Sequence, residues 1–238
     1  MSELIFRSSS QVELVDWMPR EVTFERRVVE AARVSSGTDG QAYNKAADAG
    51  LLRMLQRDRH GSPFEHAVMT FRIETPIFVA REFMRHRIAS YNETSTRYRE
   101  MEPVFYVPPA VRPLVQIGKP GAYRFEPGTP AQYRLMVETH KSVAECAWHD
   151  YQLQLEAGIA REVARNVLPL SLFTSFYVTM NLRGFENFAS LRHAHPQGEV
   201  PTFPLWEIEQ VCKEMEAYAL ELAPDIWTYF NNTGRRPV

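Results

Sequence analysis

Residues 67–74, AVMTFRIE, alternate between apolar and polar side chains, and this pattern is typical of a half-buried β-strand. The run 171–181, SLFTSFYVTMN, alternates well enough to predict a second central strand, and 12–18, VELVDWM, is interpreted as an opening strand. Long helical patterns separate these strands, without a regular βαβ rhythm. The sequence therefore predicts an α+β fold with a central antiparallel or mixed sheet flanked by long helices.

Apolar spacing predicts the helices, at 26–36, 42–60, 77–87, about 130–157, 161–169, 184–192 and 204–223. Residues 88–98, which follow the helix predicted at 77–87, are interpreted as a polar loop. Residues 101–130 are rich in proline and predict an irregular excursion rather than a domain linker, because apolar periodicity resumes on both sides.

Composition limits the class of protein. The chain has 238 residues, of which 45% are hydrophobic, so we expect one domain spanning 1–238 with one sizeable core. Its 27 Lys and Arg residues nearly balance its 29 Asp and Glu residues, which argues against nucleic acid or a membrane surface as a partner. Cys146 and Cys212 lie in amphipathic runs and indicate no disulfide framework. With no signal sequence and no apolar run long enough to span a bilayer, a cytoplasmic protein is expected.

The segment 85–98, RHRIASYNETSTRY, carries many charged and hydroxyl groups and little that a core would bury. Guanidinium groups give planar, bidentate donors for phosphate, and nearby hydroxyls complete such a pocket. The segment thus predicts a site for a phosphorylated ligand. The alternative is a solvated helix end, where arginines are favoured by the helix dipole in any case.

A second polar cluster consists of Arg165, Asn181, Arg183, Asn187, Arg192, His193 and His195. Arg183 and Asn187 share a helix face by their i, i+4 spacing, and Asn181 ends the preceding strand. Polar groups at the ends of elements often build small-molecule sites, although a solvated helix explains the pattern equally well. The segment HGSPFEH, 60–66, has a spacing that matches no common zinc pattern, so no metal is expected.

These segments resemble the flavin-dependent thymidylate synthases. Arg85-His86-Arg87, seven residues and then Ser95 fit the signature of that family. HGSPFEH, PIFVAREFMRHR, REVARNVLPLSLF and MNLRGFENFASLR are similar to its other blocks and occur in the same order. The resemblance covers most of the chain and is weakest in 101–130 and in the C-terminal tail.

The resemblance implies an enzyme that converts dUMP to dTMP. It implies methylenetetrahydrofolate as the carbon donor and NADPH as the reductant, which acts through bound FAD. It also implies a homotetramer with active sites between subunits. It implies no cysteine nucleophile and assigns to Arg192 the promotion of ionisation at N3 of the uracil. The FAD-binding residues that it implies are Ser35, Ser62, Arg85, His86, Arg87, Glu93, Asn181, Arg183 and Asn187. The dUMP-binding residues that it implies are Glu82, Phe83, Met84, Arg85, Glu93, Thr94, Ser95, Thr96, Arg97, Arg165 and Arg192.

The chain departs from the family pattern at two places. Glu82 stands where the family often has glutamine, and a carboxylate there can accept from a ribose hydroxyl but repels phosphate. Arg192 is followed by an apparent insertion, 193–206, so that either His193 or His195 takes the place of the family histidine.

Three other interpretations stay open at this point. The chain can be a flavin- or nucleotide-binding protein without turnover. It can be a nucleic-acid-binding module that stacks bases on Tyr91 and Tyr98, although the balanced charge argues against this. It can also be a metal-dependent hydrolase that uses His60, His66, His193 and His195.

Overall fold

The computed structural model describes residues 3–38 and 40–238, and the chain divides into two compact units. The α4 unit contains helix α4 (Pro130–Glu156) and comprises Glu74–Met84, Asn92–Phe176 and the N-terminal residues up to Gln11. The α7 unit contains helix α7 (Trp206–Leu222) and comprises Val12–Ile73, Arg85–Tyr91 and Tyr177–Val238. The predicted single domain stays a prediction.

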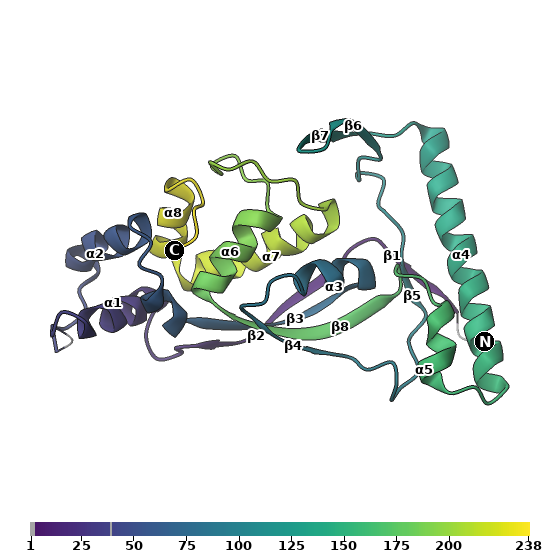
Figure 1. Cartoon of the computed structure of the whole chain (residues 1–238), viewed down its shortest axis with the longest axis horizontal. Coiled ribbons are helices and arrows are strands. Elements are labelled where there is room, and N and C mark those ends of the chain that lie inside the picture. Colours follow the sequence, from purple (N-terminus) through teal and green to yellow (C-terminus); the bar gives the residue numbers. More distant parts are fainter. Residues whose placement is uncertain (1–2, 39) are drawn as a thin grey trace. The chain divides into compact units, whose positions relative to one another are not determined.

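The predicted α+β class is confirmed (Figure 1). The other helices are α1 (Phe24–Val34), α2 (Lys45–Arg57), α3 (Ile77–Phe83), α5 (Arg161–Ala164), α6 (Leu182–Arg192) and α8 (Pro224–Asn232), with short 3-10 helices at Ser62–His66 and Arg165–Val167. The strands are β1 (Ile5–Arg7), β2 (Gln11–Met18), β3 (Val68–Pro76), β4 (Ser90–Glu93), β5 (Val104–Tyr106), β6 (Val115–Lys119), β7 (Ala122–Glu126) and β8 (Phe173–Asn181). The central sheet has the order β2-β3-β8-β4. No helix of the described ranges has both the length and the apolar character that a membrane crossing requires.

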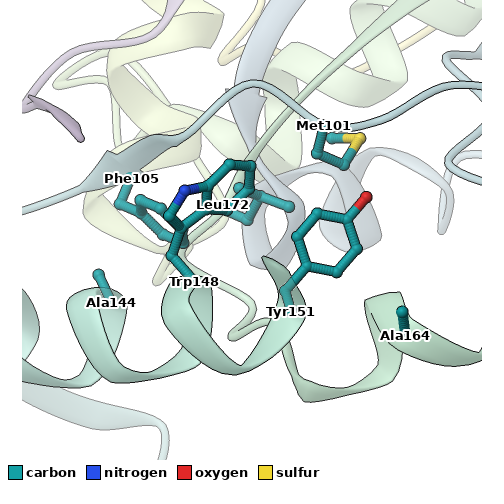
Figure 2. Close-up of a cluster of buried hydrophobic side chains, with 7 residues drawn as sticks. All are labelled: Met101, Phe105, Ala144, Trp148, Tyr151, Ala164 and Leu172. Carbon is teal, nitrogen blue, oxygen red and sulfur yellow. The ribbon is translucent and has the colours of Figure 1, made fainter. Parts of the chain in front are cut away.

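The core of the α4 unit gathers on one side of α4 (Figure 2). Trp148 packs against Tyr151 and against Phe105 of β5, with ring centroids 5.2 Å and 6.2 Å apart. Burying each such aromatic side chain contributes roughly 1.5–3 kcal/mol to folding. The helix begins at a capping box, in which Thr129 and Gln132 bond to each other's backbone N–H groups.

The α7 unit is held together by a stack of aromatic side chains. Phe185 of α6 lies parallel to Trp227 of α8, with ring centroids 5.1 Å apart, and Phe188 lies one turn further along α6. All three side chains are buried. Since α6 follows β8 directly (Figure 1), this packing fixes the direction of the polar face of α6.

Three details of the sequence prediction were wrong. The helix predicted at 77–87 ends at Phe83, and Met84 caps it with its N–H bonded to the carbonyl oxygen of Ala80. The predicted loop 88–98 contains β4, an edge strand whose pairing depends on backbone groups and leaves little trace in the side chains. The predicted irregular excursion contains the antiparallel hairpin β6–β7, whose turn requires a positive φ at Gly121.

The predicted central strands and most of the predicted helices are confirmed. The pattern at 12–18 corresponds to β2, and those at 67–74 and 171–181 correspond to β3 and β8. Helix α8 was not predicted. It begins at Pro224, directly after the helix predicted at 204–223, and proline is well suited to the first position of a helix.

Candidate active site

Helix α6 carries three of the polar residues of the α7 unit that the sequence singles out, namely Arg183, Asn187 and Arg192. Asn181 caps this helix, and its Oδ1 accepts the N–H of Gly184 at 2.8 Å. Gly184 lies close to Ile88, which follows the RHR motif (Arg85-His86-Arg87). A Cβ atom at position 184 would lie 2.8 Å from the carbonyl oxygen of Ile88. The glycine therefore allows residues 85–91 to approach α6.

Arg183, at the start of α6, is held by groups from two distant segments. Its Nη1 donates to Oε1 of Glu65 at 2.6 Å, and its Nε donates to the carbonyl oxygen of Val238 at 3.2 Å. A Cβ atom at Gly61 would lie 2.7 Å from the Nε atom of Arg183. The sequence analysis missed this ion pair, although Glu65 lies in the HGSPFEH block.

Arg183 and Asn187 line one cavity of the α7 unit, with a volume of about 530 Å³. The i, i+4 spacing correctly placed both on one side of α6. His193, His195 and the tail residues Arg235 and Arg236 also line this cavity. The cavity thus offers guanidinium and amide donors that suit an anionic or carbonyl-bearing ligand.

Ser35 and Ser62 line another cavity of the same unit, of about 470 Å³. Ser35 follows α1, and its hydroxyl donates to the carbonyl oxygen of Ala32 at 2.8 Å. Ser36, Thr38 and His60 share the lining. The structure therefore brings the two predicted serines together in a cavity with several hydroxyl groups.

Arg192, the last residue of α6, contacts His86 of the RHR motif. The Nε atom of Arg192 donates to Nε2 of His86 at 3.0 Å. His86 is buried, and burial together with the charge of Arg192 lowers the pKa of His86 from 6.5 to about 4. The imidazole is therefore neutral at physiological pH. Arg85 and Arg87, on either side of it, are exposed.

The α4 unit contains further residues that the sequence predicts for ligand binding. Glu93, at the end of β4, accepts a hydrogen bond from the hydroxyl of Thr174 at 2.6 Å. The N–H of Thr94 donates to the carbonyl oxygen of Ser175 at 2.9 Å, which extends the pairing of β4 with β8. The segment from Ser95 onward then forms a turn, in which the N–H of Tyr98 bonds to the carbonyl oxygen of Ser95 at 3.3 Å.

Two arginines belong to this turn or contact it. Nη1 of Arg165 donates to the hydroxyl of Thr96, a residue 69 positions earlier in the chain. Arg97 forms an ion pair with Glu162 at 2.9 Å, and both side chains are about half exposed. The structure thus brings together Thr96 and Arg165 within one unit, together with a carboxylate, Glu162, that the sequence analysis missed.

The predicted residues at the end of α3 differ in their surroundings. Phe83 is fully buried against Phe176, with ring centroids 5.3 Å apart, so only its backbone is accessible to a ligand. Glu82 is half buried and Met84 is exposed. Of these three, Glu82 and Met84 have side chains that can reach a ligand.

The histidines of the apparent insertion lie beside a buried ion pair. Nδ1 of His193 lies 3.0 Å from Oε2 of Glu216, and Glu216 also binds Arg235. Burial and the nearby charge of Arg235 lower the pKa of His195. Within residues 3–38 and 40–238, no group of three or more His, Cys, Asp and Glu residues is arranged to hold a metal ion.

The two tyrosines proposed as base-stacking platforms also differ. Tyr98 is 78% exposed, whereas Tyr91 is half buried and its hydroxyl donates to the carbonyl oxygen of His86 at 3.0 Å. Because stacking platforms need an exposed ring face, only Tyr98 fits that interpretation.

Comparison with known proteins gave consistent matches. The family model described as thymidylate synthase complementing protein matches residues 13–225. The chain is 49% identical over 235 residues to a flavin-dependent thymidylate synthase of Streptomyces avermitilis, covering 97% of this chain and 94% of the relative. It is 46% identical over 233 residues to one of Tropheryma whipplei (strain TW08/27), covering 97% and 96%.

A solved structure is similar over nearly the whole chain. It is that of the UMP/dUMP methylase PolB from Streptomyces cacaoi bound with 5-Br dUMP, with a TM-score of 0.92 and 42% sequence identity over 99% of this chain and 100% of PolB. The structure of PolB with 5-Br UMP gives a TM-score of 0.89 at the same identity.

Proposed function

Because the chain belongs to the thymidylate synthase complementing protein family and is therefore an enzyme, we propose that it is a flavin-dependent thymidylate synthase that methylates dUMP to dTMP. The proposal includes methylenetetrahydrofolate as the carbon donor, NADPH as the reductant through FAD, and a cytoplasmic location. The observation that carries it is the placement of Arg192 at the end of α6 against a neutral His86.

Arg192 supplies the charge that the reaction needs. Carbon C5 of uracil is a weak nucleophile, and it becomes stronger when negative charge develops on the ring. A fixed guanidinium beside the pyrimidine stabilises this charge, and such preorganised electrostatic stabilisation is commonly the largest single contribution to catalysis. Promotion of ionisation at N3 by Arg192 follows from the same interaction.

Neither cysteine lies in a setting that activates a nucleophile. Cys212 is fully buried, and burial raises the pKa of its thiol well above 9.0. Cys146 is exposed on α4, and its Sγ lies 4.0 Å from a carboxylate oxygen of Asp150, whereas reactive cysteines lie in electropositive settings. These surroundings support a route without a cysteine nucleophile.

The phosphate of dUMP fits the turn in the α4 unit. Ser95 and Thr96 supply hydroxyl donors, and Arg165 supplies a guanidinium that Thr96 orients. Arg97 adds a second cation whose partner, Glu162, is about half exposed and can be exchanged for a phosphate. Glu93, which accepts from Thr174, is an acceptor for a hydroxyl or ring N–H group of the nucleotide.

The donors of the α7 unit fit FAD. Arg183 and Asn187 in the larger cavity can donate to phosphate or ring oxygens, and Ser35 and Ser62 supply hydroxyls in the smaller one. When bound, the flavin supplies the hydride that the reduction requires. Arg85, His86, Arg87, Asn181 and Glu93 complete the proposed set of FAD-binding residues.

The proposed homotetramer is supported by apolar side chains on α4 that the α4 unit leaves uncovered. Leu135, Val143 and Leu153 are 62%, 55% and 48% exposed. They lie on one side of the helix, opposite the buried Trp148 and Tyr151. Exposed apolar stripes of this kind are typical of protein interfaces. Light scattering on the purified protein at several concentrations tests the tetramer.

A second substrate, UMP, is favoured by Glu82. This carboxylate stands where the family often has glutamine, and it can accept a hydrogen bond from a ribose hydroxyl. PolB, which is 42% identical, is described as a methylase of both UMP and dUMP. Assays with each nucleotide decide between the two, and Glu82→Gln is expected to lower any activity on UMP more than that on dUMP.

The first test is a titration of the purified protein with FAD, followed by dUMP, monitored by visible absorption. We expect saturable flavin binding and a spectral change when dUMP is added. An anaerobic assay with NADPH and methylenetetrahydrofolate should then yield dTMP. Binding of both ligands without dTMP would show a binding protein without this turnover, and failure to bind FAD would refute the proposal.

A further inference from the structure

The contact between His86 and Arg192 defines the protonation of the imidazole ring. The guanidinium group of arginine has only donors, so Nε2 of His86 must offer its lone pair to Nε of Arg192, 3.0 Å away. A neutral imidazole carries its single proton on the other nitrogen. His86 is therefore the Nδ1–H tautomer.

A second contact orients the same ring. The side chain of Asn187 forms a hydrogen bond with the side chain of His86. Because Nε2 is occupied by Arg192, Nδ1–H is the donor and the amide oxygen of Asn187 is the acceptor. Phe188 packs edge-on against the imidazole, with ring centroids 4.9 Å apart. Three residues of α6 thus fix the orientation of one ring.

We propose that His86 is a positioning residue for Arg192, which fixes the plane of the guanidinium group so that it meets the pyrimidine in one orientation. The inference rests on the proposed function, since the pyrimidine is the group that Arg192 would meet. Arg192 reaches the end of α6 on a long, flexible side chain. Ordering such a side chain before the substrate arrives reduces the entropy lost in the reaction.

The surroundings of His86 keep it in the required form. Burial and the charge of Arg192 both lower the pKa of His86, and together they outweigh the hydrogen bond with Asn187, which raises it. The sequence neighbours Arg85 and Arg87 are also cations. The phenol of Tyr91, which donates to the carbonyl oxygen of His86, adds no charge, and burial raises its pKa from 10.0 to about 12. His86 therefore remains an acceptor for Arg192 throughout the neutral pH range.

Nuclear magnetic resonance of ¹⁵N-histidine-labelled protein without substrate tests the contact directly. We expect the Nδ1–H tautomer for His86 and no titration above pH 5. In Arg192→Ala, the pKa of His86 should rise, because one of the charges that lower it is removed. His149→Ala, which removes an exposed histidine of α4, serves as the control and should leave the signals of His86 unchanged. An Nε2–H tautomer, or a pKa that does not respond to Arg192→Ala, would overturn the inference.

A double-mutant cycle with saturating FAD tests whether His86 acts through Arg192. We expect His86→Ala to lower kcat/KM for dUMP about 10- to 100-fold in the wild-type chain and less than about threefold in Arg192→Ala. His86→Gln keeps an oxygen acceptor for Nε and should recover part of the loss in kcat. Equal losses in both backgrounds would contradict a positioning role. A wild-type chain that produces no dTMP would instead refute the proposed function, and the resonance experiment would still decide whether His86 holds Arg192.

Discussion

Glu186 is expected to make the stability of the protein depend on pH. This carboxyl group of α6 is fully buried, and burial raises its pKa from 4.5 to about 8. Its Oε2 accepts from Nε2 of Gln56 at 3.0 Å and from the N–H of Val238 at 3.1 Å. Its Oε1 and the Oε1 of Gln56 have no hydrogen-bond partner among the described residues. One proton on Glu186 would satisfy both oxygens, as in an acid–amide pair.

The size of the effect follows from the two pKa values. Between pH 4.5 and about 8 the folded chain holds one proton more than the unfolded chain at this position. The free energy of unfolding therefore falls by about 1.4 kcal/mol per pH unit, or roughly 5 kcal/mol over the interval. This contribution is fully present below pH 4.5 and is lost as the pH rises through 8.

Replacing Glu186 by glutamine should remove this dependence, because the amide mimics the protonated acid and donates to Gln56. Urea unfolding of the wild-type chain and Glu186→Gln at pH 5, 6, 7 and 8 measures the difference, in which the titration of all other groups cancels. The variant should gain up to about 1.4 kcal/mol per pH unit relative to the wild type. Glu138→Gln, at an exposed position of α4, is the control. A difference between Glu186→Gln and the wild type that does not change with pH would refute a neutral Glu186.

Three further outcomes are expected. Gly184→Ala places a methyl group 2.8 Å from the carbonyl oxygen of Ile88, so urea unfolding should show a loss of about 1–3 kcal/mol, and unchanged stability would contradict the close approach. Arg165→Ala should raise KM for dUMP about 10- to 100-fold and change kcat less, because the proposed contact with phosphate would be made in the ground and transition states alike; an unchanged KM in steady-state assays would remove Arg165 from the proposed phosphate site. The double variant Cys146→Ser/Cys212→Ala should keep kcat within about threefold per folded, FAD-loaded molecule, and loss of turnover would restore a thiolate mechanism.

The sequence predicted elements with strong periodicity and missed those without it. The alternation at 67–74 identified β3, whereas β4 escaped because an edge strand needs only backbone partners. The i, i+4 spacing placed Arg183 and Asn187 on one side of α6. Their arrangement around a cavity depends on tertiary packing, which the spacing cannot give.

Pairing of charges was the least predictable part of the site. Arg183 meets Glu65, 118 positions earlier, and with 27 basic and 29 acidic residues no pattern identifies which pair will form. Glu186 illustrates the same limit, because a glutamate within an amphipathic helix normally faces solvent. Only the fold shows that this carboxyl group is fully buried beside Gln56 and the N–H of Val238.

The choice of histidine as a partner for Arg192 has a physical consequence. A carboxylate in place of His86 would orient the guanidinium group of Arg192 but would also neutralise much of its positive charge. The guanidinium would then stabilise less of the negative charge that develops on the pyrimidine. A neutral imidazole accepts the Nε–H and leaves the net charge of Arg192 unchanged. Thr96 plays the equivalent part for Arg165, since its hydroxyl also orients without neutralising. Replacing His86 by glutamate therefore separates orientation from charge: it keeps an acceptor for Arg192, and activity as low as that of Arg192→Ala would show that the charge is indispensable.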